Sequence, residues 1–412
     1  MLLLDDIPAI GERGRYVPDA TGRRLSLSYF AKPRQAESHK LRYRVFVEHI
    51  SIANFRNYVS AEVEPAPIGI TLFQGGNGSG KTNLLEAVAY FATLKSFRGA
   101  PAGAMVRHGT DHAVLRATAN REGRNLLVET ELNVTGRDKV RVNRQALRRN
   151  DDLLGLVLVT IFSPDDIEVV KGGPQSRRDY LDDLLVVLQP KHNAARTELD
   201  RILRQRNALL RSAGGALRGS MANTLDIWDE KLASVGEIIA GSREALIGTL
   251  EKQANNAYGR LSRQGPGAGE RAVGLRYERS WPGRLLPALQ SARAEDVRRG
   301  TTGVGPQRDE LHLSVNDLAA RTQASQGEQR SLALSLRLAA HAMVSDRHGS
   351  SPVLLLDDVF SELDPTRSAA LASCLPEGQT LLTTAGPVPA ELPVARRTLV
   401  RDGVVETTGL EA

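Results

Sequence analysis

Gly75-Gly-Asn-Gly-Ser-Gly-Lys-Thr82 is the stretch that decides the fold of this 412-residue chain. It satisfies the pattern G-x-x-x-x-G-K-[ST], in which glycines allow backbone N–H groups to approach phosphate oxygens. Apolar residues over 68–73 predict a strand before the loop, and apolar spacing over 83–94 predicts a helix after it. A purely structural glycine-rich turn would not require Lys81 and Thr82 in these places. The stretch therefore indicates a nucleotide-binding loop.

The predicted loop would hold a nucleoside triphosphate through its backbone and two side chains. The N-terminus of the following helix contributes about half a positive charge. Lys81 is expected to reach the β and γ phosphates, and the Thr82 hydroxyl is expected to coordinate Mg²⁺. The residues expected at the nucleotide are Gly75, Gly76, Asn77, Gly78, Ser79, Gly80, Lys81 and Thr82. ATP and Mg²⁺ are therefore the predicted cofactors, and Lys81 is a predicted catalytic residue.

A second acidic motif lies far downstream, at Val353–Asp358. Its apolar residues predict a buried strand, and Asp357 at the strand end is expected to hold Mg²⁺. Asp358 stands where most nucleotidases of the ABC type carry the carboxylate that polarises the attacking water. The alternative is a pair of acids that cap a turn. The long separation between Lys81 and Asp357 predicts that an insertion splits the nucleotide site.

Between the two motifs lies Ala324–Arg330, which precedes a predicted helix over 328–344. The segment resembles the Leu-Ser-Gly-Gly-Gln signature of the ABC family. Ser325 and Gly327 at a helix N-terminus are suited to bind a γ phosphate, and the resemblance implies that they act on the ATP of a partner subunit. Taken alone, Ser-x-Gly-Glu would also be a helix cap. The segment that ends at Asp364 resembles the loop that lines the dimer seam in that family.

Composition excludes several other classes of protein. Apolar residues make up 41% and charged residues 25% of the chain, as in ordinary globular proteins. The single cysteine, Cys374, excludes an intramolecular disulfide and a cysteine-based zinc site and indicates a reducing compartment. No apolar run reaches the roughly 18 residues that a membrane helix requires, so no membrane partner is predicted.

The basic residues point to phosphate ligands. The formal net charge is +6, and only nine of the 54 basic residues are lysine, although genomic base composition would also favour arginine. Residues 137–149 carry six basic side chains against one acid on a predicted hairpin. Two clusters predict salt-sensitive DNA binding without base specificity; a solvated basic face is the alternative. The candidates are Arg141, Arg144, Arg148 and Arg149 in the hairpin and Arg201, Arg204, Arg206, Arg211 and Arg218 in a second run.

The sequence pattern divides the chain into four parts. Residues 1–44 mix glycine, proline and charge and are predicted to be a disordered extension, with a basic arm or a misplaced start site as alternatives. Residues 45–172 and 301–412 are predicted to form one α/β head. Between them, 173–300 are predicted to be a helical lobe, in which an apolar stripe over 225–239 packs an antiparallel helix pair. The predicted fold class is α/β, a P-loop head with an inserted helical lobe.

Several longer segments resemble the RecF family of bacterial recombination mediators, whose ATPase head is similar to that of SMC proteins. The matching segments are Asn54–Tyr58, Lys81–Glu86, Ser96–Arg98, Phe162–Asp166, Val170–Pro174, Arg177–Arg178, Gly305–Asp309, Ser325–Arg330 and Leu354–Asp364. The resemblance implies an ABC-type ATPase in the cytoplasm, at the nucleoid, that forms a homodimer when ATP binds. It further implies binding to duplex DNA beside single-stranded gaps, release on slow hydrolysis, and loading of RecA with RecO and RecR.

The resemblance also implies roles for individual residues. Arg56 matches a basic position near the nucleotide, and Arg98 matches an arginine that SMC-type heads use near ATP and DNA. Ser163 stands where related ATPases carry a glutamine ligand, and Thr383 and Thr384 stand where transporters carry a switch histidine. Both departures from the common pattern predict slow hydrolysis.

Two other functions are alternatives. An SMC-like structural ATPase that clamps or tethers DNA would need hundreds of coiled-coil residues, far more than 173–300 provide. A transporter ATPase subunit would carry the glutamine and histidine switches and would lack the helical lobe. The sequence therefore favours an ATP-dependent DNA-binding protein of recombinational repair and replication restart, with weak DNA-dependent ATPase activity.

Overall fold

The computed structural model describes residues 16–18, 24–26, 45–121, 123–217, 219–262 and 272–408. The chain divides into two compact units, Met1–Arg42 and Tyr43–Ala412. In the first unit, β1 (Tyr16–Pro18) pairs antiparallel with β2 (Arg24–Ser26). The disorder predicted over 1–44 otherwise lies outside the described residues.

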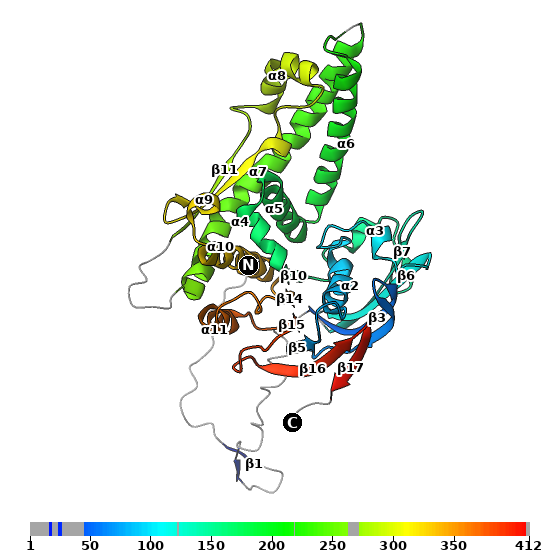
Figure 1. The fold of residues 1–412 in the computed structure, drawn as a ribbon, viewed down its shortest axis with the longest axis vertical. Helices are drawn as coiled ribbons and strands as arrows, with labels where there is room; N and C mark the ends of the chain where they lie inside the picture. Colours follow the sequence, from blue (N-terminus) through cyan, green and yellow to red (C-terminus); the bar gives the residue numbers. More distant parts are fainter. Residues whose placement is uncertain are drawn as a thin grey trace. The chain divides into compact units, whose positions relative to one another are not determined.

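A six-stranded sheet carries the phosphate loop in the second unit (Figure 1). Its order is β10-β14-β15-β5-β16-β17, with β17 antiparallel to β16 and all other neighbours parallel. Every residue of β14 is buried, as its continuous apolar run predicts for a strand covered on both faces. The strands are β5 (Gly69–Gln74), β10 (Val159–Phe162), β14 (Val353–Asp357), β15 (Gln379–Thr384), β16 (Val394–Arg401) and β17 (Val404–Thr408).

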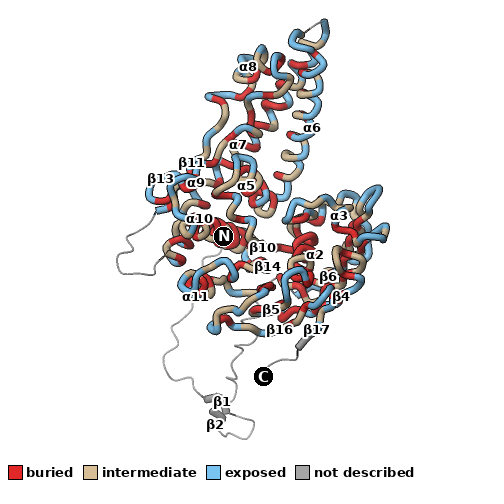
Figure 2. The backbone as a smooth tube through the Cα atoms, viewed as in Figure 1, coloured by how far each residue is buried: buried red, intermediate tan, exposed pale blue. Residues whose placement is uncertain are grey.

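A second sheet is antiparallel and has the order β4-β3-β6-β7-β8-β9. Helix α2 (Lys81–Thr93) lies between the two sheets, and its residue Leu84 shares one apolar core with Ile52 of the antiparallel sheet and Leu355 of the parallel sheet. Figure 2 shows this helix as buried over most of its length. The antiparallel strands are β3 (Val45–Phe55), β4 (Tyr58–Val63), β6 (His112–Arg121), β7 (Arg124–Asn133), β8 (Lys139–Val142) and β9 (Gln145–Ala146); α3 (Ala102–Met105) and η2 (Asn150–Leu153) lie in connections.

The opposite face of the parallel sheet is covered by α10 (Gln326–His348), α11 (Pro365–Cys374) and the end of α7. Leu354 of β14 shares an apolar core there with Leu338 and Leu371 of the two helices. The loop between β5 and α2 and the acids that end β14 therefore belong to a sheet that is packed from both sides. This packing holds the strand ends in fixed positions.

Helices dominate the region between the two halves of the head (Figure 1). The predicted antiparallel pair is α6 and α7, and Leu232 and Ile239 of the apolar stripe pack against Leu199 and Ile202. Helix α7 has 42 residues, or about 63 Å at 1.5 Å per residue. Between residues 173 and 300 the elements are α5 (Pro174–Leu188), α6 (Lys191–Ser212), α7 (Met221–Ser262), β11 (Val273–Glu278) and α8 (Leu285–Arg299). The first half of the head ends with η3 (Pro164–Ile167) and α4 (Glu168–Lys171), and the second half begins with η4 (Pro306–Arg308), β12 (Glu310–Val315), β13 (Leu318–Ala319) and α9 (Ala320–Gln323).

One local prediction was wrong. The residue pattern of Gly303–Leu311 predicts a strand over this whole segment. The strand β12 starts only at Glu310, because a 3-10 turn intervenes at Pro306–Arg308. Gly305 has φ +126°, and Pro306 stands at the first position of the turn, so the backbone cannot continue as a strand. None of the helices in the described residues is long and apolar enough to cross a membrane.

Candidate nucleotide site

The predicted phosphate loop joins β5 to α2, as expected from the apolar segments on either side of it. Gly78 and Gly80 have φ values of +80° and +112°, which glycine adopts readily. A Cβ atom on Gly80 would lie 2.6 Å from Asn57 Nδ2 and 3.0 Å from the Tyr58 hydroxyl oxygen. Both the backbone conformation and the neighbouring side chains therefore require glycine at position 80.

Lys81 lies folded over this loop. Its Nζ atom donates hydrogen bonds to the carbonyl oxygens of Gly75 at 3.0 Å and Gly76 at 2.8 Å, and the residue is only 6% exposed. Burial lowers the pKa of the Lys81 ammonium, and the negative charges of Asp358 and Asp357 oppose that shift. The lysine is thus held by weak neutral acceptors that a phosphate could replace.

The rest of the loop also fits a phosphate group. The buried Ser79 Oγ has no hydrogen-bond partner among the residues that the structure describes. The Cβ positions of Gly76 and Gly78 open onto free space, whereas a Cβ on Gly75 would meet Val400 O at 2.2 Å. A buried hydroxyl without a partner is costly, and a ligand acceptor would satisfy it. The loop therefore has donors and room for the phosphates of a nucleotide.

Two hydroxyls and a carboxylate meet beside the loop. Thr82 Oγ1 donates to Asp357 Oδ1 at 2.9 Å, and Thr383 Oγ1 donates to the same oxygen at 2.7 Å. Burial raises the pKa of Asp357, and the hydrogen bonds from Thr383 and Thr82 oppose the shift. Hard oxygen ligands of this kind suit Mg²⁺, so Thr82 and Asp357 fit the predicted metal role.

Asp358 turns the chain away from β14. Its φ is +50°, and its N–H group donates to Thr383 O at 3.1 Å. Ala385 N lies 3.4 Å from Asp358 Oδ1, and the residue is half-buried. The turn brings a second carboxylate next to Asp357 with access to solvent, which is the arrangement needed for a group that polarises water.

The two arginines expected near the nucleotide both contact side chains of α2. Arg56 makes a two-pronged ion pair with the fully buried Glu86, through Nε and Nη2 at 2.8 Å each. Arg98 Nη1 donates to Asn83 Oδ1 at 3.3 Å, and its positive charge opposes the rise in the pKa of Asp357 that burial causes. Arg98 is therefore electrostatically coupled to the acidic site, whereas the charge of Arg56 is balanced by Glu86.

The signature segment and the loop after β14 meet at a different place. Ser325 caps α10 in a capping box, with Glu328 N donating to Ser325 Oγ at 3.3 Å. A Cβ atom on Gly327 would lie 2.4 Å from Arg367 Nη2, and Arg367 N donates to Asp364 Oδ1 at 2.9 Å. The predicted residues Ser325, Gly327 and Asp364 thus lie around the N-termini of α10 and α11.

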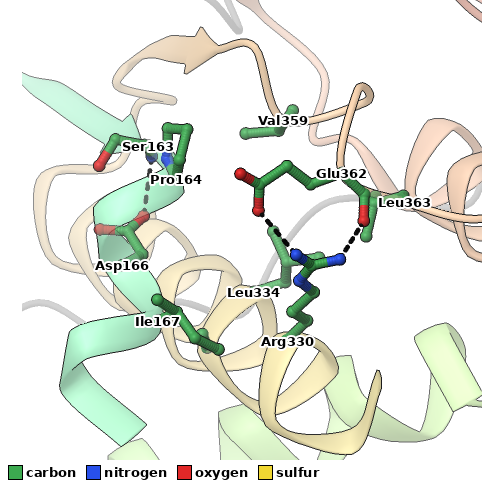
Figure 3. A pocket seen from close by; sticks show the side chains of 10 residues that line it. Ser163, Pro164, Asp166, Ile167, Arg330, Leu334, Val359, Glu362 and Leu363 are labelled. Carbon is green, nitrogen blue, oxygen red and sulfur yellow. Dashed lines mark hydrogen bonds and ion pairs between the residues drawn. The ribbon is translucent and has the colours of Figure 1, made fainter. Parts of the chain in front are cut away.

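A small cavity lies between the segment after β10, helix α10 and the loop after β14 (Figure 3). Ser163, in the place of the usual glutamine, donates its N–H group to Asp166 Oδ2 at 2.9 Å. Across the cavity, Arg330 of α10 lies 3.2 Å from Glu362 of the loop after β14. Asp166 also pairs with Arg337 of α10 at 2.6 Å. Three segments of the predicted ATPase machinery are therefore in contact here.

The basic hairpin forms as β8 and β9, and its four candidate arginines are exposed. Asn143 and Arg144 at the turn have φ values of +50° and +68°. The second arginine run was misjudged at Arg206, which is fully buried between Asp229 and Asp296 at 2.8 Å each. Since those carboxylates neutralise it inside the lobe, it is not available to DNA.

Sequence reasoning missed three residues that shape the site. Asn57 Nδ2 donates to Ser79 O at 3.1 Å, and the Tyr58 hydroxyl donates to Gly80 O at 3.0 Å. Both lie in a segment that matched the RecF family, where only Arg56 received a role. Thr383 was noted as a departure from a histidine, but nothing in the sequence placed its hydroxyl on Asp357.

The loop, the strand-end acids and the helix-capping signature, on a sheet packed from both sides, define an ATPase head of the ABC and SMC class. The family model described as "RecF/RecN/SMC N terminal domain" matches residues 46–384. "DNA replication and repair protein RecF" of Streptomyces avermitilis is 42% identical over 377 residues, covering 87% of this chain and 99% of the relative. The protein of the same description from Kineococcus radiotolerans is 40% identical over 390 residues, covering 88% and 98%. This chain belongs to the RecF family.

Solved structures agree with the predicted α/β fold class. A structure of the recombination mediator protein RecF-ATPrS in the RecFOR pathway has a TM-score of 0.81 and 28% identity, covering 89% of this chain and 99% of that one. An Smc head domain from Pyrococcus furiosus has a TM-score of 0.51 and 15% identity, covering 89% and 96%. The second likeness concerns the fold alone. The prediction of an ABC/SMC-type head with an inserted helical lobe is confirmed.

Proposed function

We propose that this protein is an ATP-driven DNA-binding dimer of recombinational repair. Mg-ATP binding would close two heads on duplex DNA beside a single-stranded gap, and slow hydrolysis would release the DNA. The observation that carries the proposal is the hydrogen bond between Thr82 and Asp357, which lie in motifs far apart in the sequence. That contact supports one composite nucleotide site built from both halves of the head.

The proposed chemistry divides among four side chains. Lys81 would exchange its bonds to the loop carbonyls for bonds to phosphate oxygens, and Thr82 and Asp357 would hold Mg²⁺. The metal, when bound, supplies charge neutralisation on the phosphates. Asp358 would accept the proton of the water that attacks the γ phosphorus, yielding ADP and phosphate. Its partly exposed carboxylate supports this role.

The signature surface supports the proposed homodimer. Ser325, Gly327 and Asp364 gather around the N-termini of α10 and α11, where backbone N–H groups favour an anion. We propose that this surface completes the nucleotide site of the partner subunit. Arg56 is proposed to act near the nucleotide held by its own subunit's phosphate loop, through α2, where it pairs with Glu86.

The exposed hairpin supports a proposed DNA contact. Arg141, Arg144, Arg148 and Arg149 are all exposed, and such a set binds phosphates without reading bases. Arg98 is proposed to contact DNA or ATP. The family membership supports the further proposals of weak DNA-dependent ATPase activity, of RecO, RecR and RecA as partners, and of a cytoplasmic, nucleoid-associated location.

We also propose that the chain is divided into an extension (1–44), two head segments (45–172 and 301–412) and a helical lobe (173–300).

Binding to gapped duplex DNA, measured with and without Mg-ATP across a salt series, tests the function. We expect binding to strengthen with Mg-ATP, to weaken with salt, and to lose its response to ATP in Lys81→Met. Equal binding with and without ATP would contradict the clamp and would favour ATP control of a protein partner. A Lys81→Met variant that still closes on DNA with ATP would overturn the proposed mechanism.

A further inference from the structure

Thr383 lies where the two acidic residues of the site meet, yet the proposed chemistry gives it no part. Strand β15 runs parallel to β14, and the register sets Thr383 beside Asp357. The residue is fully buried. A buried hydroxyl needs partners on both its donor and its acceptor side, so its contacts define what it holds.

Both sides of the hydroxyl face the acidic pair. Its proton goes to Asp357 Oδ1 at 2.7 Å, and its oxygen accepts from the Asp358 N–H group at 3.1 Å. The carbonyl oxygen of Thr383 accepts from the same N–H group at 3.1 Å. One residue therefore fixes the carboxylate proposed to hold Mg²⁺ and the backbone of the carboxylate proposed to act on water.

The backbone at Asp358 makes this support necessary. Its φ of +50° is a left-handed conformation that an aspartate adopts at some cost. The bonds to Thr383 offset that cost, and they come from the sheet rather than from the phosphate loop. Asp357 therefore keeps a hydrogen bond from the sheet in addition to the one from Thr82 at the end of the phosphate loop.

We infer that Thr383 is a positioning residue for the acidic pair. It replaces the switch histidine of transporters with a hydroxyl that orients Asp357 for the metal and Asp358 for the water. The inference rests on the proposed ATPase function. Removing an outer partner of a metal ligand commonly lowers metal affinity by about 10–100-fold.

The test compares Thr383→Val, which keeps the side-chain shape, with Thr383→Ser, which keeps the hydroxyl. Thr384→Val is the matched control, because the equally buried Thr384 hydroxyl bonds with Gly386 O at 3.0 Å and Gly386 N at 3.1 Å. Binding of a fluorescent ATP analogue is measured while Mg²⁺ is titrated, and kcat and KM for ATP are measured separately.

We expect Thr383→Val to raise the half-saturating Mg²⁺ concentration about tenfold and to lower kcat more than it changes KM. Thr383→Ser and Thr384→Val should stay within about twofold of the wild type in Mg²⁺ response. Equal Mg²⁺ responses of Thr383→Val and Thr384→Val would overturn the inference alone. A wild-type chain that does not bind Mg-ATP would overturn the proposed function instead.

If valine at position 383 prevents folding, variants with smaller side chains provide the same test. Thr383→Ala is then compared with Thr383→Ser, with Thr384→Ala as its control. The inference requires that serine preserves the Mg²⁺ response and that alanine loses about tenfold. Equal Mg²⁺ responses in the alanine and serine variants would overturn it.

Discussion

The nucleotide site and the helical lobe both bury carboxylates, but they balance them differently. Asp357 in the site receives hydrogen bonds from neutral hydroxyls, and burial raises its pKa. In the lobe, burial alone would raise the pKa of Asp182, but hydrogen bonds from Arg243 and His192 hold it well below its usual range. The lobe neutralises its acids internally, whereas the site leaves a negative charge for a cation to complete.

The largest predicted effect is a difference in stability when the same substitution, Asp→Asn, is made in each of the two regions. Asp182→Asn leaves the buried Arg243 guanidinium without its counterion and should lower the free energy of unfolding by about 3–5 kcal/mol. Asp357→Asn removes a carboxylate whose charged form burial disfavours, so the nucleotide-free protein should keep its stability or become slightly more stable. Urea unfolding of the nucleotide-free protein measures both variants.

The matched control for the lobe is Arg298→Ala, since Arg298 forms an exposed pair with Glu295. We expect no measurable change in stability from it. Equal destabilisation by Asp182→Asn and Asp357→Asn would contradict the difference between the two regions. It would show that the charge of Asp357 is neutralised inside the protein, as the charge of Asp182 is.

His341 and Asp182 should change the free energy of unfolding in different pH ranges. Burial lowers the pKa of His341 in α10 to about 4, so the folded protein keeps it neutral while the unfolded chain binds a proton below pH 6.5. Stability should therefore fall by roughly 2 kcal/mol between pH 6.5 and pH 5. The Asp182 contribution has a depressed folded pKa, is complete above about pH 3.9, and is lost only as the pH falls below that value.

Unfolding by urea at several pH values measures this difference, and His341→Gln supplies the control. The variant should flatten the loss between pH 6.5 and pH 5 and leave the response below pH 4 unchanged. An unaltered slope in His341→Gln would show that another group carries the first loss.

The signature surface should respond to added volume. Gly327→Ala places a methyl group 2.4 Å from Arg367 Nη2, so the guanidinium that pairs with Asp364 must shift. We expect the ATP-dependent dimer to weaken about tenfold, or about 1.4 kcal/mol, as measured by sedimentation. Gly241→Ala in α7 is the control, since its Cβ meets nothing within 4 Å. Equal dimer affinity in both variants would contradict a role for this surface.

The smallest predicted effect is at the basic hairpin. Arg144 is exposed at the β8–β9 turn, so Arg144→Ala should leave stability unchanged and weaken DNA binding severalfold. The slope of affinity against salt should fall by about one unit. Arg298→Ala, which removes an exposed arginine from the lobe, should change neither quantity. If Arg144→Ala and the wild type show the same salt slope, Arg144 does not contact DNA and the hairpin is a solvated basic surface.

Local patterns predicted most of the elements that carry the site. The structure forms the strand predicted before Gly75, the strand predicted to end at Asp357 and the helix predicted after Ser325. Each of these elements depends on residues that are near one another in the sequence. The second arginine run misled, because a linear count of charge cannot show that Asp229 and Asp296 approach Arg206 from other helices.

The sequence by itself determined the α/β class, the order of the motifs and their division between two halves of one head. Glycine spacing, apolar periodicity and capping residues act over a few neighbours, so they can be recognised along the chain. Only the tertiary structure decided that the hydroxyls of Thr82 and Thr383 donate to the same carboxylate oxygen of Asp357. It also decided which buried charges are balanced, because strand order and helix packing bring together residues that the chain keeps far apart.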